Sequence, residues 1–321
     1  MNLHQNKTLF SQSVRATAQH MNIADIYVEK DYWVTLALHT IFNNVIGKET
    51  VFKGGTALSK CFNLIERFSE DIDLVMVRNE GEGTSKMERK VKKPSKVIAS
   101  IIPEITVEGL THKRGMLRKT VHQYGNQFTG DYGQVRDVIV LETSYLGRYE
   151  PYHNTEVNSY IGEMMLAVNQ KDLAKQYNML PFTVQVMHVN RTICEKIMSL
   201  VRFSYGEAPI QQLKDKIRHT YDIHQLLQVT EIAAFFNSST FDVMLKNVAE
   251  DDKLSFKSDN AWLNNHPKDA VVFAETEKIW TELKSTYDID FARLVYGNLP
   301  DEKDVLNSLK KVATRLGKIE Y

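Results

Sequence analysis

The spacing of apolar residues changes along this chain of 321 residues. Residues 26–42 carry apolar side chains at helical spacing, which predicts an amphipathic helix. Downstream, short apolar or alternating stretches indicate strands at residues 50–53, 71–77, 105–110, 118–128 and 137–146. A helix ending near Phe62 is expected between the first two strands. After residue 152 the pattern becomes mainly helical, with helices predicted at residues 190–205, 211–229, 261–263 and 270–283.

This order of elements predicts an α+β fold with two parts. Residues 1–150 would form a catalytic core, with N-terminal helices and a mixed sheet flanked by helices. Residues 151–321 would form a mainly helical domain. The boundary is expected at residues 147–152, where Tyr-Glu-Pro interrupts both patterns. A chain of this length is long enough for two domains.

A glycine pair followed closely by two aspartates carries the main chemical signal. Gly54-Gly55-Thr56 comes directly after the first predicted strand, and Asp71 and Asp73 lie on the next one. Because side chains alternate along a strand, both aspartates point to the same face. Two adjacent carboxylates repel each other unless a cation lies between them, and oxygen ligands suit Mg²⁺ carrying a nucleoside triphosphate. The glycines allow the backbone to approach phosphates, and Thr56 or Ser59 is expected to cap the following helix, whose N-terminus favours anions.

Each half of this pattern is common on its own. A glycine pair often forms a plain turn, and an Asp-x-Asp often lies on a solvated strand. The order apolar strand, glycine turn, helix and acidic strand is much more specific, and it indicates metal-dependent nucleotidyl transfer. The P-loop sequence Gly-x-x-x-x-Gly-Lys-[Ser/Thr] and the Rossmann sequence Gly-x-Gly-x-x-Gly are both absent.

Three further charged residues are candidates for the same chemistry. Glu142 is acidic within an apolar strand and would supply the third carboxylate common in two-metal transfer; the alternative is an exposed position or a salt bridge. Lys196 follows the apolar stripe of its helix and would reach the triphosphate, unless its stem runs along that stripe to water. Asp222 lies four residues after Arg218, the spacing of an ordinary surface ion pair.

Composition narrows the class of protein. With 43% hydrophobic and 25% charged residues, and 40 basic against 40 acidic side chains, the chain is an ordinary globular protein without an overall nucleic-acid signature. Two cysteines, Cys61 and Cys194, exclude a disulfide scaffold and a cysteine-rich zinc site, and we expect buried thiols in a reducing cytoplasm. The chain lacks a signal-peptide pattern and an apolar run of membrane-spanning length, so a cytoplasmic protein without a membrane partner is expected.

Sequence blocks in a fixed order add a family resemblance. They are KGGTALSK (residues 53–60), RFSEDIDL (67–74), RTICEKI (191–197) and RHTYDI (218–223), preceded by EKDYWV (29–34). In these blocks the chain resembles the AbiEii/AbiGii-type nucleotidyltransferase toxins of abortive-infection and type IV toxin–antitoxin systems. The resemblance covers about two-thirds of the chain.

The resemblance implies a DNA polymerase β-like nucleotidyltransferase core and a helical C-terminal part. It implies that Gly55 and Thr56 bind phosphate, at a motif where the family often has Ser instead of Thr. It implies that Asp71 and Asp73 bind the metal. The later lysine and aspartate motifs fall on Lys196 and Asp222, with Asp222 viewed as a base. The full predicted nucleotide-binding set is Gly54, Gly55, Thr56, Ser59, Lys60 and Lys196, and Glu142, which no sharp motif supports, completes the metal set.

With the resemblance, we expect transfer of a nucleoside monophosphate from an NTP to an RNA acceptor, the tRNA 3′ end, with Mg²⁺ or Mn²⁺ as cofactor. A cognate antitoxin encoded nearby is the expected protein partner. The basic segment at residues 86–96, with Lys113, Arg114, Arg118 and Lys119, would hold the RNA backbone; the alternative is a solvated basic loop. Two other functions stay open: nucleotidylylation of a protein hydroxyl, such as AMPylation, and a catalytically silent NTP-binding module.

Overall fold

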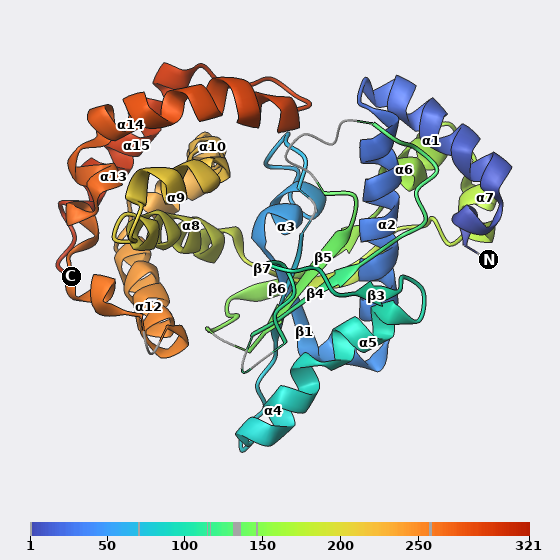
Figure 1. Ribbon diagram of the computed structural model, residues 1–321, viewed down its shortest axis with the longest axis horizontal. Helices are drawn as coiled ribbons and strands as arrows, with labels where there is room; N and C mark the ends of the chain where they lie inside the picture. Colours follow the sequence, from blue (N-terminus) through green and yellow to red (C-terminus); the bar gives the residue numbers. More distant parts are fainter. Residues whose placement is uncertain are drawn as a thin grey trace. The chain divides into compact units, whose positions relative to one another are not determined.

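The computed structural model of the chain describes residues 2–69, 71–113, 115, 117–130, 136–145, 147–256 and 259–321 (Figure 1). Arg114, a candidate RNA-binding residue, and Glu70, in the second sequence block, lie outside the described residues. The chain divides into two compact units. Unit 1 comprises Met1–Asn63, Phe68–Tyr145 and Tyr152–Val186, and unit 2 comprises Leu64–Arg67, Leu146–Pro151 and Met187–Tyr321.

A mixed sheet forms the centre of unit 1. Its strands in the described residues are β1 (Thr50–Lys53), β2 (Ile72–Met76), β3 (Glu104–Ile105), β4 (Leu117–His122), β5 (Ile139–Ser144), β6 (Tyr152–Val157) and β7 (Phe182–Met187). Their order in the sheet is β3-β4-β5-β2-β1-β7-β6. β2 is antiparallel to β1 and parallel to β5, and β4 is antiparallel to β5. The strand that follows the first aspartate, β2, is therefore the central one.

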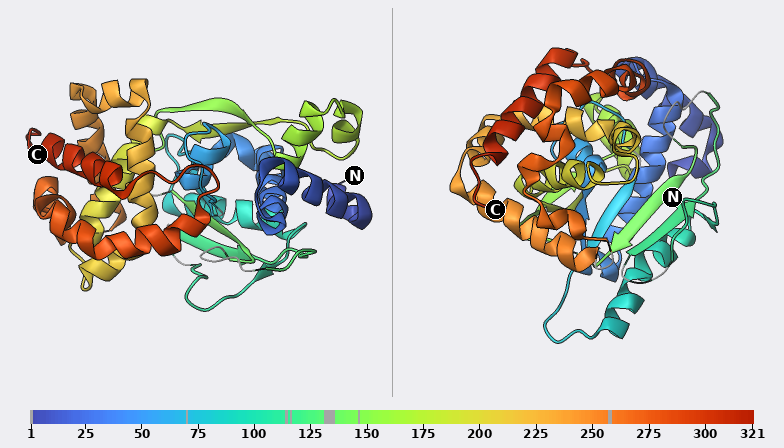
Figure 2. Two further views of the ribbon diagram at one scale, coloured as in Figure 1. Left: turned by 90° about the horizontal axis from the view of Figure 1, so that it is seen from above. Right: turned by 60° about the vertical axis from the view of Figure 1, so that its left-hand side comes forward.

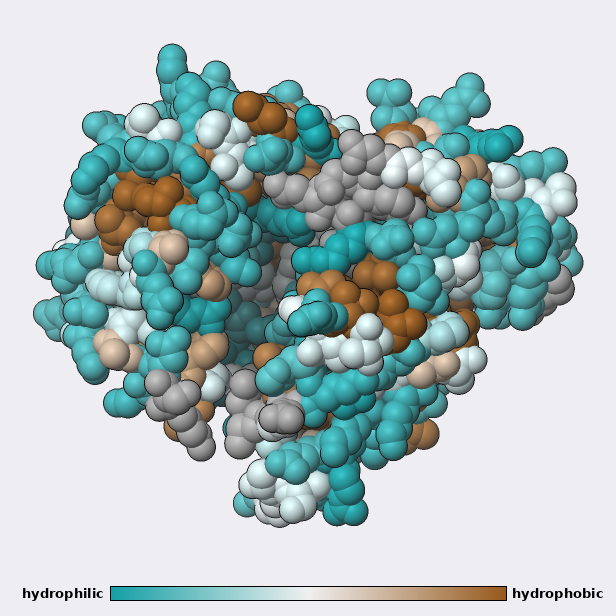
Figure 3. Space-filling model, viewed as in Figure 1, coloured by the Kyte–Doolittle hydropathy of each residue, from teal (hydrophilic) through white to brown (hydrophobic). Residues whose placement is uncertain are grey.

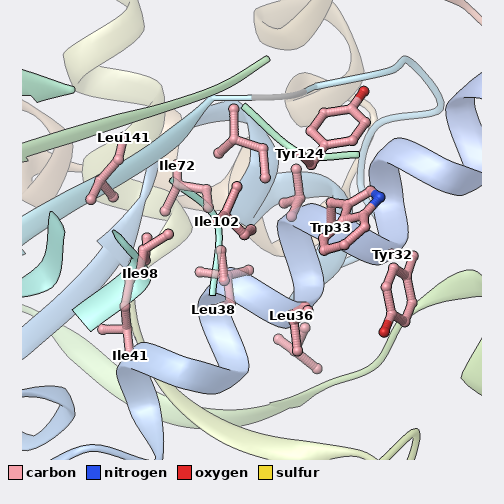
Figure 4. Packing of buried hydrophobic residues seen from close by; sticks show 14 of the residues in the cluster. Tyr32, Trp33, Leu36, Leu38, Ile41, Ile72, Ile98, Ile102, Tyr124 and Leu141 are labelled. Atoms are coloured by element: carbon pink, nitrogen blue, oxygen red, sulfur yellow. The ribbon is translucent and has the colours of Figure 1, made fainter. Parts of the chain in front are cut away.

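Helices surround this sheet within unit 1. They are α1 (Lys7–Met21), α2 (Asp25–Phe42), α3 (Gly54–Lys60), α4 (Thr84–Val91), α5 (Lys93–Ala99), α6 (Tyr160–Ala167) and α7 (Lys171–Gln176). Apolar side chains of α2, including Trp33 and Leu38, share one buried cluster with Ile72 of β2 and Leu141 of β5 (Figure 4). This cluster holds the central strands in place.

α2 is not amphipathic as predicted, because it is buried on nearly all sides, charged residues included. Glu29 accepts hydrogen bonds from the backbone N–H groups of Gln127 (2.8 Å) and Phe128 (3.0 Å). Lys30 donates to the carbonyl oxygen of Val138 at 2.7 Å, just before β5. Buried charges require such partners, so the charged residues of α2 tie it to the loops around the sheet.

Unit 2 is mainly helical. Its helices among the described residues are α8 (Val189–Phe203), α9 (Pro209–Asp215), α10 (Ile217–Leu227), α11 (Thr230–Phe236), α12 (Ser239–Ser255), α13 (Val271–Ala274), α14 (Thr276–Ser285) and α15 (Glu302–Leu316) (Figure 2). The mixed sheet with flanking helices and the helical second part confirm the predicted α+β class. None of the helices formed by described residues has the length and apolar character that a membrane span requires.

The strand predictions hold best near the centre of the sheet. Residues 50–53, 71–77 and 137–146 contain β1, β2 and β5, whereas the prediction at 118–128 is confirmed only as far as His122. The strand predicted at 105–110 is wrong beyond Ile105, because the chain turns at Gly109, which has a φ of 75°. β6 and β7 were not predicted, since β6 is mostly polar and exposed and lacks an apolar alternation.

Two of the predicted helices are each divided into two shorter helices in the structure. The single helix expected at 211–229 is two helices, α9 and α10, because the backbone at Lys216 leaves the helical region (φ −107°, ψ 16°). The one at 270–283 is likewise divided at Glu275 (φ −122°, ψ 42°). Residues 261–263 fall within a short 3-10 helix, Ala261–Asn264. Apolar spacing survives each break, so periodicity alone does not reveal it.

The basic segment at residues 86–96 forms parts of α4 and α5 instead of a loop, and most of its charged side chains are exposed to solvent, as the alternative to RNA binding expects. Lys90 is buried, pairs with Glu82 at 2.7 Å and donates to the carbonyl of Val77 at 2.9 Å. Its ammonium is therefore committed to the fold.

The face in Figure 3 is largely hydrophilic, and its apolar groups form separate patches. Most charged side chains of such a surface are solvated and uninformative.

Candidate active site

The glycine turn is built against the acidic strand. Gly54 follows β1 with a φ of +81°, a conformation that side chains disfavour, and a Cβ atom there would overlap the Asp73 carboxylate. Lys53, the preceding residue, is extended. Two independent constraints, backbone conformation and space, thus require glycine at this position. They also show that the backbone of the turn and the carboxylate of Asp73 are in direct contact.

Strand register extends this contact into a row of charged residues. Lys53 of β1 pairs with Asp73 of β2, Asp73 pairs with Glu142 of β5, and Glu142 pairs with Lys119 of β4. Residues opposite each other on neighbouring strands project to the same face. The row therefore reads lysine, aspartate, glutamate, lysine across one face of the sheet. All members are half-buried.

The two carboxylates at the centre of this row repel each other. Burial raises the pKa of Asp73 to about 7, and the charges of Glu142 and Asp71 add to the increase, while Lys53 and Lys119 oppose it. A carboxylate with such a pKa gains strongly from a bound cation.

Asp71 is the third carboxylate near the row. Its Oδ1 is buried without a hydrogen bond from the described residues, and the nearest charge is Nη1 of Arg136 at 3.5 Å. No three His, Cys, Asp or Glu side chains in the described ranges are close enough to hold a metal together. Mg²⁺ suits this arrangement, because proteins usually hold it with one or two carboxylates and leave the other positions to substrate phosphates and water. Two of the carboxylates of Asp71, Asp73 and Glu142, but not all three together, would therefore fit a divalent cation that binds with its nucleotide.

Thr56 plays a different part from the predicted one. Its hydroxyl is buried and donates to the backbone oxygen of Asp71 at 2.6 Å, and it lies 3.0 Å from Oγ of Ser69. The residue that caps α3 is Lys53, without a side-chain cap, and Ser59 lies in the last turn. The expectation that Thr56 or Ser59 caps this helix is wrong. Thr56 instead connects the glycine turn to the start of β2.

Lys60 is held inside unit 1. Its Nζ lies 2.5 Å from Oδ1 of Asp31 on α2, and it donates to the carbonyl of Asn158 at 3.2 Å. It also lies over the ring of Tyr160, 5.0 Å from the centroid. Both members of the ion pair are almost fully buried. These contacts fix the C-terminal end of α3 and leave the ammonium little freedom to follow a nucleotide.

The later lysine and aspartate meet within unit 2, where a third residue joins them. Nζ of Lys196 lies 2.6 Å from Oδ2 of Asp222. Arg67 binds the same carboxylate in a two-pronged manner, with Nε to Oδ1 and Nη2 to Oδ2, both at 2.7 Å. All three side chains are buried. The predicted surface pair of Asp222 with Arg218 is therefore wrong, and the Lys196 ammonium does not run to water.

Electrostatics make Asp222 a poor proton acceptor. Burial alone would raise the pKa of Asp222, but the Arg67 guanidinium and the Lys196 ammonium hold it well below its usual range. Both oxygens already accept charge-assisted hydrogen bonds. The contacts favour a role in orienting Lys196 over a role as a base.

Sequence reasoning gave no role to Arg67 or Lys53, although both stand at the start of a motif block. The only signal for Arg67 was its place among the apolar residues Leu64, Ile65 and Phe68, where a buried arginine would need a carboxylate partner. Among the other proposed RNA-binding residues, Lys113 pairs with Glu104 at 2.5 Å, and Arg118 lies 3.6 Å from the same carboxylate.

A glycine turn packed against paired carboxylates, on a mixed sheet, is the arrangement of an enzyme that transfers nucleotidyl groups. The chain belongs to the family of nucleotidyl transferase AbiEii toxins of type IV toxin–antitoxin systems, whose sequence model matches residues 37–312. This confirms the predicted family and the enzyme class. Membership implies an NTP substrate and an antitoxin partner.

Comparisons with solved structures and with curated protein sequences give less information than the family model. The crystal structure of JHP933 from Helicobacter pylori superposes with a TM-score of 0.43 at 16% sequence identity, covering 90% of this chain and 93% of the other. A search of curated protein sequences gave no match.

Proposed function

We propose that the protein transfers a nucleoside monophosphate from an NTP to the 3′ end of an RNA, with tRNA as the acceptor and Mg²⁺ or Mn²⁺ as the cofactor. The observation that carries this proposal is the contact of Gly54 with the Asp73 carboxylate, beside Glu142 on the same face. A turn that admits phosphate and a carboxylate pair that needs a cation are thus adjacent.

Each residue of unit 1 has a defined task in this proposal. Asp71, Asp73 and Glu142 would supply the carboxylate ligands of the divalent cation, and the bound cation would neutralise the triphosphate and lower the pKa of the attacking hydroxyl. The backbone of Gly54 and Gly55 lies along the phosphates, since no side chain separates them from it. The protein contributes mainly by positioning and by charge, as expected for phosphoryl chemistry.

In unit 2, Lys196 stays the proposed phosphate ligand, and Asp222 is proposed to orient it. Because Arg67 shares the Asp222 carboxylate, Lys196 is not its only counter-charge. The Lys196 ammonium can therefore turn toward a phosphate without leaving an unpaired buried carboxylate, which would be costly. Thr56 and Lys60 are proposed to support the turn and α3 instead of binding nucleotide directly.

RNA as the acceptor is supported by the family resemblance and by the cationic side chain of Lys119 beside Glu142. The decisive experiment incubates the purified protein with each α-labelled NTP and Mg²⁺, together with total tRNA or with a protein lysate. Asp73→Asn serves as the inactive control. We expect label in tRNA, lost with Asp73→Asn and with tRNA whose 3′ diol has been oxidised by periodate.

Other outcomes would overturn the proposal in distinct ways. Label in the protein fraction alone would support nucleotidylylation of a protein hydroxyl. NTP binding without label in either fraction would support a catalytically silent module. Equal labelling by wild type and Asp73→Asn would refute the assignment of the metal carboxylates.

A further inference from the structure

The charged row on the sheet consists of Lys53, Asp73, Glu142 and Lys119, and its two ends have different surroundings. At the β1 end, Lys53 is followed directly by the Gly54-Gly55 turn. At the β4 end, Lys119 lies beyond Glu142, on the side of the carboxylates away from that turn. The two lysines are three strand spacings apart, about 14 Å at roughly 4.8 Å per strand. The two ammonium groups therefore stand at opposite ends of the carboxylates.

In-line transfer of a nucleotidyl group requires the acceptor and the triphosphate to bind at opposite ends of this row. The attacking oxygen and the leaving oxygen lie on opposite sides of the phosphorus, so acceptor and pyrophosphate occupy opposite sides of the site. The leaving side must be the one next to the glycine turn, because the triphosphate needs close approach of the backbone. The acceptor then enters from the other side of the carboxylates, where Lys119 lies.

The Lys119 ammonium is suited to this contact. It forms no ion pair with any described residue, although Lys113 and Arg118 nearby both engage Glu104. It is also half-buried on the same face as Glu142. Without a metal, the Lys119 charge partly offsets the charge of the Asp73 carboxylate. Once a divalent cation neutralises the carboxylates, the ammonium is available to an anion.

We propose that this row has a direction: its Lys53 end binds the triphosphate of the NTP, and its Lys119 end binds the last phosphodiester of the RNA acceptor. The second half of this inference rests on the proposed function, because it names RNA as the acceptor. It identifies Lys119 as the acceptor-side phosphate ligand and Lys53 as the nucleotide-side ligand.

The test separates the two substrates kinetically. Lys119→Met should raise the KM for tRNA at least tenfold and change the KM for NTP less than twofold. Lys53→Met should do the reverse. Lys119→Arg and Lys53→Arg keep the charge and should recover most of the loss, which a merely structural defect would not show. Lys171→Met, at an exposed position of α7, is the control for the loss of one positive charge and should change neither KM.

A second readout requires no turnover. In Mg²⁺ without NTP, the affinity for a labelled single-stranded RNA ending in a 3′ hydroxyl is measured at several salt concentrations. Loss of one phosphate contact in Lys119→Met should reduce the salt slope by about 0.7. Lys53→Met and Lys171→Met should retain the wild-type slope.

The proposal fails if Lys119→Met raises the KM for NTP, or if Lys171→Met matches Lys119→Met in both assays. The first result would reverse the direction of the row, and the second would replace a subsite with a general basic surface. If wild type labels no RNA, the proposed function fails on its own. The direction of the row would then still be decided by NTP binding to Lys53→Met and by the RNA salt slope of Lys119→Met.

Discussion

The pKa of Asp73 allows a test that needs neither substrate nor metal. Burial, with the Glu142 and Asp71 carboxylates, raises this pKa from 3.8 to about 7. Between these two pH values the native protein keeps a proton on Asp73 that the unfolded chain has lost. Stability rises with pH only where the unfolded state binds more protons, so this group makes native stability fall as pH rises from about 4 to about 7.

Asp73→Asn removes the charge and keeps the shape of the side chain. At about 1.4 kcal/mol per pH unit, the difference in pKa corresponds to roughly 4 kcal/mol for a fully buried carboxylate. Asp73 is half-buried, and Lys53 and Lys119 lie in the same row. With this screening, we expect the variant to be more stable than wild type by about 1–2 kcal/mol at pH 8 and equally stable near pH 4.

The assay is urea unfolding in EDTA across this pH range. Asp137→Asn, at an exposed position, controls for a general loss of negative charge. Glu142→Gln should relieve the same repulsion, so the double variant should gain less than the two single gains together. The reasoning would be refuted if Asp73→Asn raised the free energy of unfolding equally at every pH. It would also be refuted if wild type were more stable than Asp73→Asn at pH 8.

Two further substitutions test the contacts of the site. Gly54→Ala should abolish NTP binding measured by calorimetry, because its methyl group displaces the Asp73 carboxylate. Gly81→Ala is the control for backbone strain, since Gly81 has a φ of +74° with open space around it, and this variant should bind NTP normally. Equal loss of NTP binding in both variants would show that backbone strain alone matters. Asp222→Asn should lower the free energy of unfolding, measured in urea, by about 3–5 kcal/mol, because it leaves two buried cations without a carboxylate. Asp242→Asn, at a partly exposed ion pair, should lower it by at most about 1 kcal/mol. A similarly small loss for both variants would contradict the buried cluster.

Much of unit 1 follows from local sequence. Gly54 and the pair Asp71 and Asp73 are separated by one helix, so the chain has few ways to arrange them, and the strand alternation gives the face of each side chain. Glu142 was harder to assign, because nothing local states that its strand lies beside β2. Sheet order decides this, and sheet order depends on contacts distant in sequence.

Partners that are far apart in sequence could not be predicted. Asp222 was expected to pair with a neighbour one turn away, but Arg67, 155 positions earlier, binds it. Lys60 was expected to bind nucleotide from its motif position, but Asp31 of α2 holds it. In both cases local spacing offered a plausible partner, and burial selected a different one, because a buried charge requires a complete set of contacts.

The segment Leu64–Arg67 packs with unit 2, although the residues on both sides of it belong to unit 1. A fragment starting at Met187 would therefore lack the guanidinium that completes the environment of Asp222, and a fragment ending at Val186 would carry that guanidinium without its carboxylate. A single cut at residue 186 leaves all of unit 1 on one fragment, but it always separates Leu64–Arg67 and Leu146–Pro151 from the rest of unit 2.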